Sequence, residues 1–383
     1  MRNILRNIYR TAQQRLTYTM MFPKTYISYI KRTTKKYTNK EGAYAIVNMD
    51  KTFKYDDHGR YFYIVCMYLN YSGYNVVVKI NCSDLYNPLR YKKYLLQQDY
   101  TFVRKSSAPV NTIVLVQPNT INHIIHFSYG HHFLNSTGFD CVAPYPLHPY
   151  QYKFYLSPTF AIEAKKSTRT IKILFAGSAN EKLYKSENIE RHFKHLNIIS
   201  RLKVLEFILS NFEKCRVFQG DQDRAALISL VYSENYSNEI IISKVKTKVE
   251  DWLKILSKSD FFICPPGQGM PWSHNSVEAM SAGAIPIIQY SELFTPHLEN
   301  YKNCLHYTNY AELKLAIERA FSMNSSEIEN MRKNVLTYFN DYLSIDSIAK
   351  RIKKFSSSEQ RELKVAIPYM RSEAERQEKE IEI

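Results

Sequence analysis

Residues 257–290 carry the pattern that most constrains the fold: two apolar runs that flank a Pro-Pro-Gly-x-Gly loop and a helical segment. Each run has the length of a buried strand, and the helix is predicted over 274–283. The segment therefore indicates a strand–helix–strand unit of a parallel sheet. Gly283 stands where a glycine commonly ends a helix, and Ser273 or Asn275 can cap its start.

The rest of the chain repeats this alternation, which predicts an α/β protein. Its 383 residues suit two domains of roughly 150–200 residues each. In the first half, strand 44–49, a helix from Arg60 that closes at Gly73, and strand 75–80 form a βαβ unit. Further strands are predicted at 112–117, 123–127, 170–176, 260–264 and 284–289, and further helices at 195–213, 247–258 and 310–322.

Proline and charge divide the chain. Four prolines between residues 142 and 158 break helices and favour extended backbone, which predicts an inter-domain linker. The stretch from about 324 to the end is charged and is predicted to be helical. The predicted organisation is a basic segment over 1–40, an α/β domain over 41–150, a linker over 151–168, an α/β domain over 169–345 and a charged helical tail over 346–383.

The net charge of +16 is unevenly placed, because residues 1–40 hold ten Lys and Arg and no acid. This segment lacks the apolar core of a secretory signal, and no apolar run is long enough to span a bilayer. Two interpretations stay open: contact with an anionic membrane surface, or an ordinary solvated basic segment. The other basic residues do not form one stripe in the sequence, which disfavours nucleic acid as a partner.

The six cysteines are scattered singly, without Cys-x-x-Cys pairs or Cys/His ligand spacing. This pattern indicates neither a small disulfide framework nor a zinc site. Several lie in apolar runs, where a reduced Cys behaves as a small hydrophobe. A cytoplasmic location follows as the expectation, at the inner membrane face if the basic segment binds lipid.

The position of the loop after strand 260–264 predicts an anionic ligand there. Open α/β sheets bind ligands at the carboxyl ends of their strands, and a helix N-terminus there favours an anion such as a diphosphate. Glu278, expected in the first turn of the helix, can accept hydrogen bonds from ribose hydroxyls. The alternative is that Glu278 only complements the helix dipole and that the glycines only form a turn.

The segment CPPGQGMPWSHNSVEAMSAGAIPII resembles the donor-domain signature of exostosin-like glycosyltransferases. More broadly it resembles an element of GT-B enzymes, which have two Rossmann-like domains facing a cleft. The likeness is strong over some 35 residues and loose over 170–320. It implies that Glu278 holds the ribose of a nucleotide-sugar. It also implies a diphosphate-facing set formed by Gly267, Gln268, Gly269, Ser273, His274 and Asn275.

A second motif, ILFAGSAN, ends a predicted strand in Gly177 and Ser178. It resembles the first donor-domain strand of the same families, in which a downstream cation pairs with the diphosphate. The candidates for this cation are Lys182, Arg191 and Arg201, and Arg201 at the start of a helix is favoured. Each one taken alone can equally be a solvated basic residue.

The loop YDDHGRYFY offers the general base that a transfer needs to take the proton from an acceptor hydroxyl. Asp57 or His58 is the predicted base, and the alternative is that Asp56 or Asp57 caps the following helix. Many retaining GT-B enzymes carry a Glu where this chain has Met270, which favours an inverting reaction. No metal is expected, since cations and helix dipoles can meet the diphosphate charge. Four histidines within 123–132 are typical of structural imidazoles, and His148 is expected near the cleft.

These residues predict a glycosyltransferase that moves a sugar from a nucleotide-sugar to a glycan or lipid-linked acceptor, in surface polysaccharide or glycan synthesis and without a cofactor. A non-catalytic nucleotide-sugar or glycan-binding protein is the alternative. A dinucleotide oxidoreductase is disfavoured, because no Gly-x-Gly-x-x-Gly follows a strand.

Overall fold

The computed structural model describes residues 23–24, 26–33, 42–55, 59–81, 84, 92–118, 120–130, 138–157, 160, 168–182, 184, 190, 196–267 and 270–368. The chain separates into two compact units. The first unit runs to Ser128 and takes in 138–141 and Ile348–Val365. The second consists of 129–137, Val142–Ser347 and the residues from Ala366 onward.

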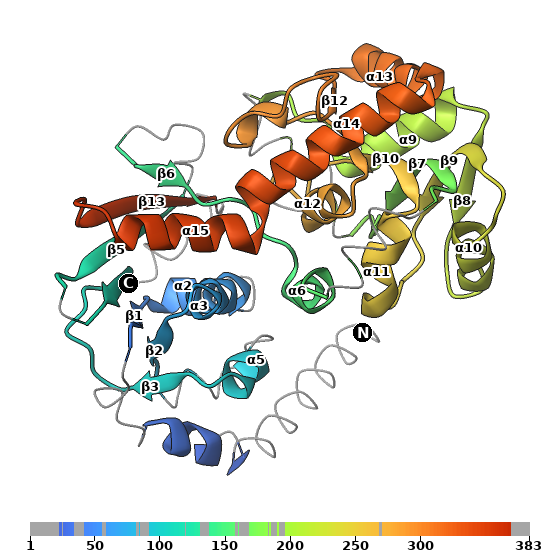
Figure 1. The fold of residues 1–383 in the computed structure, drawn as a ribbon. Helices are drawn as coiled ribbons and strands as arrows, with labels where there is room; N and C mark the ends of the chain where they lie inside the picture. The colour runs from blue at the N-terminus through green and yellow to red at the C-terminus, as the bar shows by residue number, and fades with distance from the viewer. Residues whose placement is uncertain are drawn as a thin grey trace, which may run out of the picture. The chain divides into compact units, whose positions relative to one another are not determined.

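The first unit is built on a seven-stranded sheet of order β3-β2-β1-β4-β5-β13-β6 (Figure 1). Strand β1 lies parallel to β2, and helix α3 joins them, so the expected βαβ unit is confirmed. On its other side β1 pairs antiparallel with β4, which pairs antiparallel with β5. The elements are β1 (Tyr44–Asn48), α2 (Lys51–Tyr55), α3 (Arg60–Tyr71), β2 (Asn75–Lys79), α5 (Lys92–Gln97), β3 (Thr101–Val103), β4 (Thr112–Val116), β5 (His123–Gly130), β6 (Cys141–Val142), α15 (Ile345–Ser356) and β13 (Glu362–Pro368).

Two segments of this unit differ from the prediction. Helix α2 lies in the stretch expected to be a loop, because an Asp50 carboxylate oxygen accepts the Phe53 backbone N–H at 2.7 Å and the Phe53 ring is fully buried. Strand β13 lies in the predicted helical tail, so that prediction is wrong for residues 362–368. Val365, Ala366 and Ile367 are buried there as part of the sheet. Residues 369–383 lie outside the described part of the chain.

The second unit contains a six-stranded parallel sheet of order β12-β11-β10-β7-β9-β8. Its strands are β7 (Ile171–Ala176), β8 (Cys215–Phe218), β9 (Ser237–Ser243), β10 (Ser259–Cys264), β11 (Ile285–Ile288) and β12 (Leu305–His306). Its helices are α6 (Pro149–Tyr155), α9 (Arg201–Asn211), α10 (Arg224–Val231), α11 (Val249–Leu256), α12 (His274–Ser281), α13 (Tyr310–Ser322) and α14 (Ser325–Tyr338), and a π-helical turn follows over Phe339–Leu343. The expectation of an α/β fold is confirmed, with a parallel sheet in the second unit and a mixed sheet in the first.

Helix α6 corrects the expectation of extended backbone over 142–158. Pro149 occupies the first helical position, where its fixed φ suits a helix and its missing N–H costs no hydrogen bond. His148 precedes it as the N-cap, and its ring nitrogen accepts the Tyr150 N–H at 3.4 Å. Pro144 and Pro146 precede the helix in non-helical backbone, as predicted.

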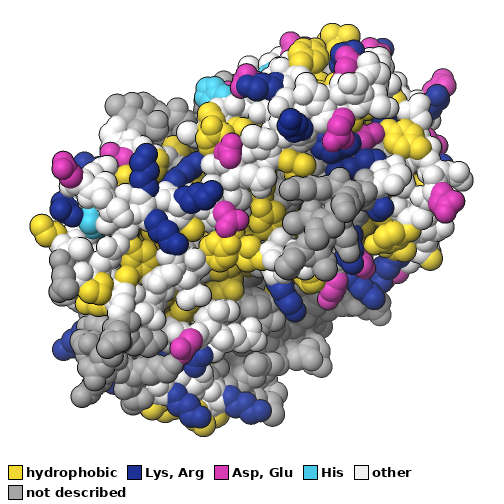
Figure 2. Space-filling model, in the orientation of Figure 1, with side chains coloured by type: hydrophobic (Ala, Val, Ile, Leu, Met, Phe, Trp, Pro, Cys, Tyr) yellow, Lys and Arg dark blue, Asp and Glu magenta, His cyan; other side chains and the backbone are white. Residues whose placement is uncertain are grey.

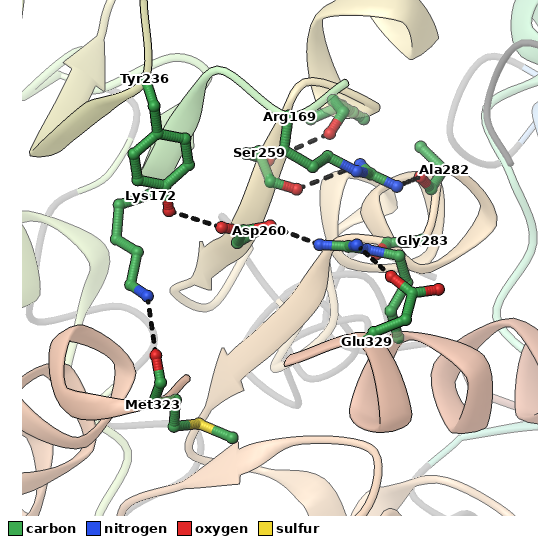
Figure 3. Close-up of polar contacts among 11 residues, drawn as sticks. Arg169, Lys172, Tyr236, Ser259, Asp260, Ala282, Gly283, Met323 and Glu329 are labelled. Atoms are coloured by element: carbon green, nitrogen blue, oxygen red, sulfur yellow. Dashed lines mark hydrogen bonds and ion pairs between the residues drawn. The ribbon is translucent and has the colours of Figure 1, made fainter. Parts of the chain in front are cut away.

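A partly buried polar network connects the amino ends of β7 and β10 (Figure 3). The Asp260 carboxylate accepts the Tyr236 hydroxyl at 2.6 Å and also pairs with the Arg332 guanidinium. Arg169, just before β7, donates to the carbonyls of Ser259 at 3.1 Å and Ala282 at 3.0 Å. These contacts connect the strands at this edge of the sheet, which indicates a structural role for them.

Candidate functional site

The strand order of the second unit places a topological switch point between β7 and β10. These strands are neighbours, but the chain leaves β7 toward β8 and β9, and it leaves β10 toward β11 and β12. The loops that follow them at the carboxyl edge begin at Gly177 and Pro265. Ligands of open α/β sheets bind in the crevice at such a point, and both predicted motifs lie there.

Gly177 allows helix α12 to approach the end of β7. Its φ of +152° is one that L side chains rarely adopt, and an added Cβ would lie 2.6 Å from Nδ2 of Asn275. That Asn275 nitrogen donates to the Ala176 carbonyl at 2.8 Å. The structure thus brings together two residues that the sequence analysis assigned to the same ligand.

Arg201 joins the two loops. It begins α9, as predicted, and its Nε donates to the Pro266 carbonyl at 3.0 Å while Nη1 donates to the Ser178 carbonyl at 3.0 Å. The guanidinium also lies 4.2 Å from the ring centroid of Tyr184.

Arg201 is only 4% exposed, and burial lowers the pKa of its guanidinium. Within the described residues it makes no ion pair with a carboxylate. A buried charge is costly unless it is paired, so this guanidinium is suited to an anion at the switch point.

Glu278 lies on the wall of a pocket of about 220 Å³ beside this point. It is the fifth residue of α12, which corrects its expected place in the first turn, and it is 2% exposed. Its Oε2 accepts Nε1–H of Trp252 at 2.5 Å, and Oε1 accepts the backbone N–H of His148 at 3.2 Å. The pocket is lined by His148, Tyr150, Gln151, Thr247, Lys248, Val249, Trp252, His274, Asn275 and Glu278.

Histidine rings form another part of this wall. Nδ1 of His274 lies 2.8 Å from the Pro146 carbonyl, and because a carbonyl only accepts, Nδ1 carries the proton in this contact. The rings of His274 and His148 meet edge to face, with centroids 5.5 Å apart. His148 therefore lies at the pocket, although sequence placed it only by position.

The start of α12 has no side-chain cap. Ser273 is the N-cap residue, but its buried hydroxyl lies 3.3 Å from that of Ser276 rather than on the backbone. The Asn275 side chain is used at Ala176. The expectation that Ser273 or Asn275 caps the helix through its side chain is therefore wrong.

The glycine loop after β10 closes on itself. The Gly267 N–H donates to the Met270 carbonyl at 2.8 Å, and an added Cβ at Gly267 would lie 2.6 Å from the Trp272 carbonyl oxygen. This turn requires a glycine. Gln268 and Gly269, between its ends, lie outside the described residues.

The remaining predicted residues are less constrained. Lys182 is exposed on the loop after β7, where its backbone N–H donates to Oδ1 of Asn180 at 2.9 Å. Asp57 and His58 fall between α2 and α3 in the first unit, and they lie outside the described residues, as does Arg191.

One Asp-x-Asp triplet, 221–223, follows β8. The expectation of a metal-free donor site assumed that no such motif occurs in the sequence, and that assumption is wrong. The carboxylates of the triplet have local partners: Asp223 accepts the Gln219 N–H at 2.7 Å, and Asp221 pairs with Arg224 at 2.6 Å. No group of three or more His, Cys, Asp or Glu is arranged for a metal ion within the described part of the chain.

No helix among the described residues is long and apolar enough to cross a bilayer.

Comparison with known proteins gives distant structural likenesses only. No family model matches the chain, and no curated protein matches it significantly. Anabaena Alr3699/HepE in complex with UDP and glucose is 11% identical, with a TM-score of 0.39 over 82% of this chain and 99% of that one. A glycosyltransferase from Rickettsia africae is 12% identical, with a TM-score of 0.35 over 76% and 79%. The UDP-forming α,α-trehalose-phosphate synthase from Burkholderia xenovorans is 10% identical, with a TM-score of 0.32 over 78% and 71%. With identity and TM-score this low, the function has to be inferred from the residues of the chain itself.

Proposed function

We propose that the protein is a nucleotide-sugar-dependent glycosyltransferase of the GT-B type, with its donor site at the switch point of the second unit. The observation that carries this proposal is Arg201, a buried cation held by the carbonyls of both switch-point loops. A diphosphate is the anion that this position suits, since the uncapped start of α12 lies on the same edge.

The pocket beside Glu278 takes the nucleoside part of the donor in this proposal. At about 220 Å³ it is smaller than the roughly 300–1,000 Å³ of pockets for whole drug-sized ligands, which suits one portion of a nucleotide-sugar. The Glu278 carboxylate accepts hydrogen bonds from the Trp252 indole and from the backbone of His148. In this proposal it also accepts one from a ribose hydroxyl, since an ionised carboxylate has about four acceptor positions.

The reaction that we propose is an inverting displacement without a metal. Asp57 or His58 takes the proton from the acceptor hydroxyl, whose oxygen forms a bond to the anomeric carbon. The bond from that carbon to the diphosphate breaks, and the nucleoside diphosphate leaves with its negative charge against Arg201 and the α12 terminus. The acceptor is a glycan or a lipid-linked sugar of polysaccharide or glycan synthesis, reached at the inner membrane face through the basic segment over 1–40.

The test is binding and turnover with the full chain. Calorimetry with UDP and GDP, followed by a panel of radiolabelled UDP- and GDP-sugars with and without acceptors, should give binding and acceptor-dependent release of the nucleotide. Glu278→Ala should lose both, whereas Glu318→Ala, an exposed acid on α13, should lose neither. If no nucleoside diphosphate binds to the folded wild-type chain, the proposal fails.

The alternative, a nucleotide-sugar or glycan-binding protein without catalysis, gives a different result in the same assay. It predicts binding that depends on Glu278 but no turnover, and no effect of Asp57→Ala or His58→Ala on any measurement. Loss of turnover in one of these variants, with donor binding intact, supports the enzyme.

A further inference from the structure

Helix α15 exposes one continuous basic face, formed by Lys350, Arg351, Lys353 and Lys354. The opposite side of the helix is apolar, and its residues Ile345, Ile348, Ala349 and Phe355 are buried. Figure 2 shows Lys and Arg side chains gathered on the surface over the position of α15 in Figure 1. The helix is therefore fixed to the protein by its apolar side and presents its cations to solvent.

The four cations of this face outnumber the acids of the helix, since Asp346, exposed in its first turn, is the one acid between Ile345 and Ser356. Within the described residues, Lys350, Lys353 and Lys354 make no ion pair with a carboxylate. Glu362 on β13 pairs with His126 at 3.5 Å instead. The basic residues outside 1–40 do not form one stripe in the sequence, but α15 gathers four of them on one helix.

The chemistry of the face favours a lipid surface as its partner. Clusters of four or more Lys and Arg on an amphipathic helix bind anionic headgroups, with a contribution from each cation. No large hydrophobic side chain is exposed between residues 345 and 367. Contact is therefore electrostatic rather than insertion, and it weakens with salt. Single-stranded nucleic acid is less well matched, because among the described residues from 345 to 367 no exposed aromatic ring accompanies these cations for base stacking.

We propose that the basic face of α15 docks the first unit on the surface of an anionic bilayer. The contact is separate from the donor site, which belongs to the second unit, and it holds whether or not the protein transfers sugar. It is also separate from the basic segment over 1–40, so full membrane affinity requires both.

The experiment is co-sedimentation of the full chain with vesicles of phosphatidylcholine, with and without phosphatidylglycerol, at low and high salt. One variant neutralises the face, with Lys350→Gln, Lys353→Gln and Lys354→Gln. The matched control neutralises three exposed lysines of the second unit, with Lys214→Gln, Lys314→Gln and Lys333→Gln. Circular dichroism and thermal unfolding verify that both variants fold.

We expect the face variant to bind phosphatidylglycerol vesicles at least about tenfold more weakly than wild type, and the control to stay within a few-fold. Equal losses of vesicle affinity in both variants would mean that net charge alone explains the binding, and would overturn the proposal. No loss in either would overturn it as well. If the face variant loses affinity for a single-stranded oligonucleotide while its vesicle binding is unchanged, the face serves nucleic acid and the lipid proposal is wrong.

Discussion

Trp252 donates its indole N–H to Glu278 at 2.5 Å, which makes a carboxylate on α12 the anchor of a side chain on α11. The other carboxylate oxygen holds the backbone at His148, so Glu278 joins three helices while it faces the pocket. A residue in this position can affect both folding and binding, and the two effects need separate measurements.

We expect Glu278→Gln to weaken nucleoside diphosphate binding more than Trp252→Phe does. The glutamine amide keeps the size of the side chain, but its N–H₂ group faces either the Trp252 indole N–H or the His148 backbone N–H. That donor is then left unsatisfied, at a cost of roughly 1–3 kcal/mol. Phe at position 252 keeps an aromatic ring and leaves the carboxylate available. Calorimetry with UDP and GDP measures the nucleotide affinity of both variants, and thermal unfolding measures their stability. A Glu278→Gln protein that binds as wild type does would exclude the carboxylate from ligand recognition.

Arg201 is predicted to recognise the diphosphate and not the nucleoside. Arg201→Gln retains N–H donors for the loop carbonyls but removes the charge, so affinity for UDP or GDP should fall about tenfold or more, and affinity for uridine or guanosine should change little. The comparison is made by calorimetry on one protein preparation. An equal loss for nucleoside and nucleoside diphosphate would show that Arg201 only shapes the loops.

Local sequence was sufficient for the elements around the switch point. The Pro-Pro-Gly loop, the Ser273 start and Gly283 bound α12 to within two residues, because turn and cap chemistry is encoded next to the helix itself. Gly177 was informative because its φ of +152° at the end of β7 is one that L side chains rarely adopt.

Long-range contacts could not be predicted from such signals. Trp252 and Gln151 reach the pocket through contacts with Glu278 and Val249 that are distant in sequence, and no local pattern marks them. Strand β13 was missed because its charged amino end, with Glu362 and Lys364, resembles the preceding helix, whereas pairing in a sheet decides its conformation. The exposed basic face of α15 could not be predicted either, because it depends on which side of the helix is buried against the protein.

The start of α14 predicts a specific response to acid. Asn324 and Glu327 form a capping box, and the backbone N–H of Asn324, followed by the Arg319 guanidinium, holds the pKa of the Glu327 carboxyl below its ordinary value. A carboxyl with a lowered folded pKa stabilises the fold above its unfolded pKa of about 4.3, and that contribution is lost as the pH falls through the folded value. Glu327→Gln keeps the geometry of the box but not the charge.

The free energy of unfolding, from urea titrations, should therefore differ between wild type and Glu327→Gln by a constant amount near neutral pH. The difference should shrink as the pH falls below about 4.3. Glu318→Gln, whose Lys314 partner lies 4.0 Å away, is the control. A difference that stays unchanged in acid would mean that the charge of Glu327 plays no part.

Gln151 is predicted to contact the base of a bound nucleotide. It lines the pocket on α6, is 5% exposed, and its Nε2 donates to the Val249 carbonyl at 3.4 Å. Its Oε1 is buried and has no hydrogen-bond partner within the described residues. A buried carbonyl without a donor is costly, and a ring N–H of uracil or guanine can supply the donor. This prediction rests on the proposed nucleotide site.

A double-mutant cycle between protein and ligand tests this contact. Methylation of the ring nitrogen, N3 of UDP or N1 of GDP, should weaken binding to wild type, by roughly tenfold for one lost hydrogen bond to a buried group. Gln151→Leu removes the acceptor at nearly constant volume, so the same methylation should then cost little. If methylation costs the same in both proteins, Gln151 does not face the base, although the site itself would stand. If the unmethylated nucleotides do not bind at all, the fault lies with the proposed function instead.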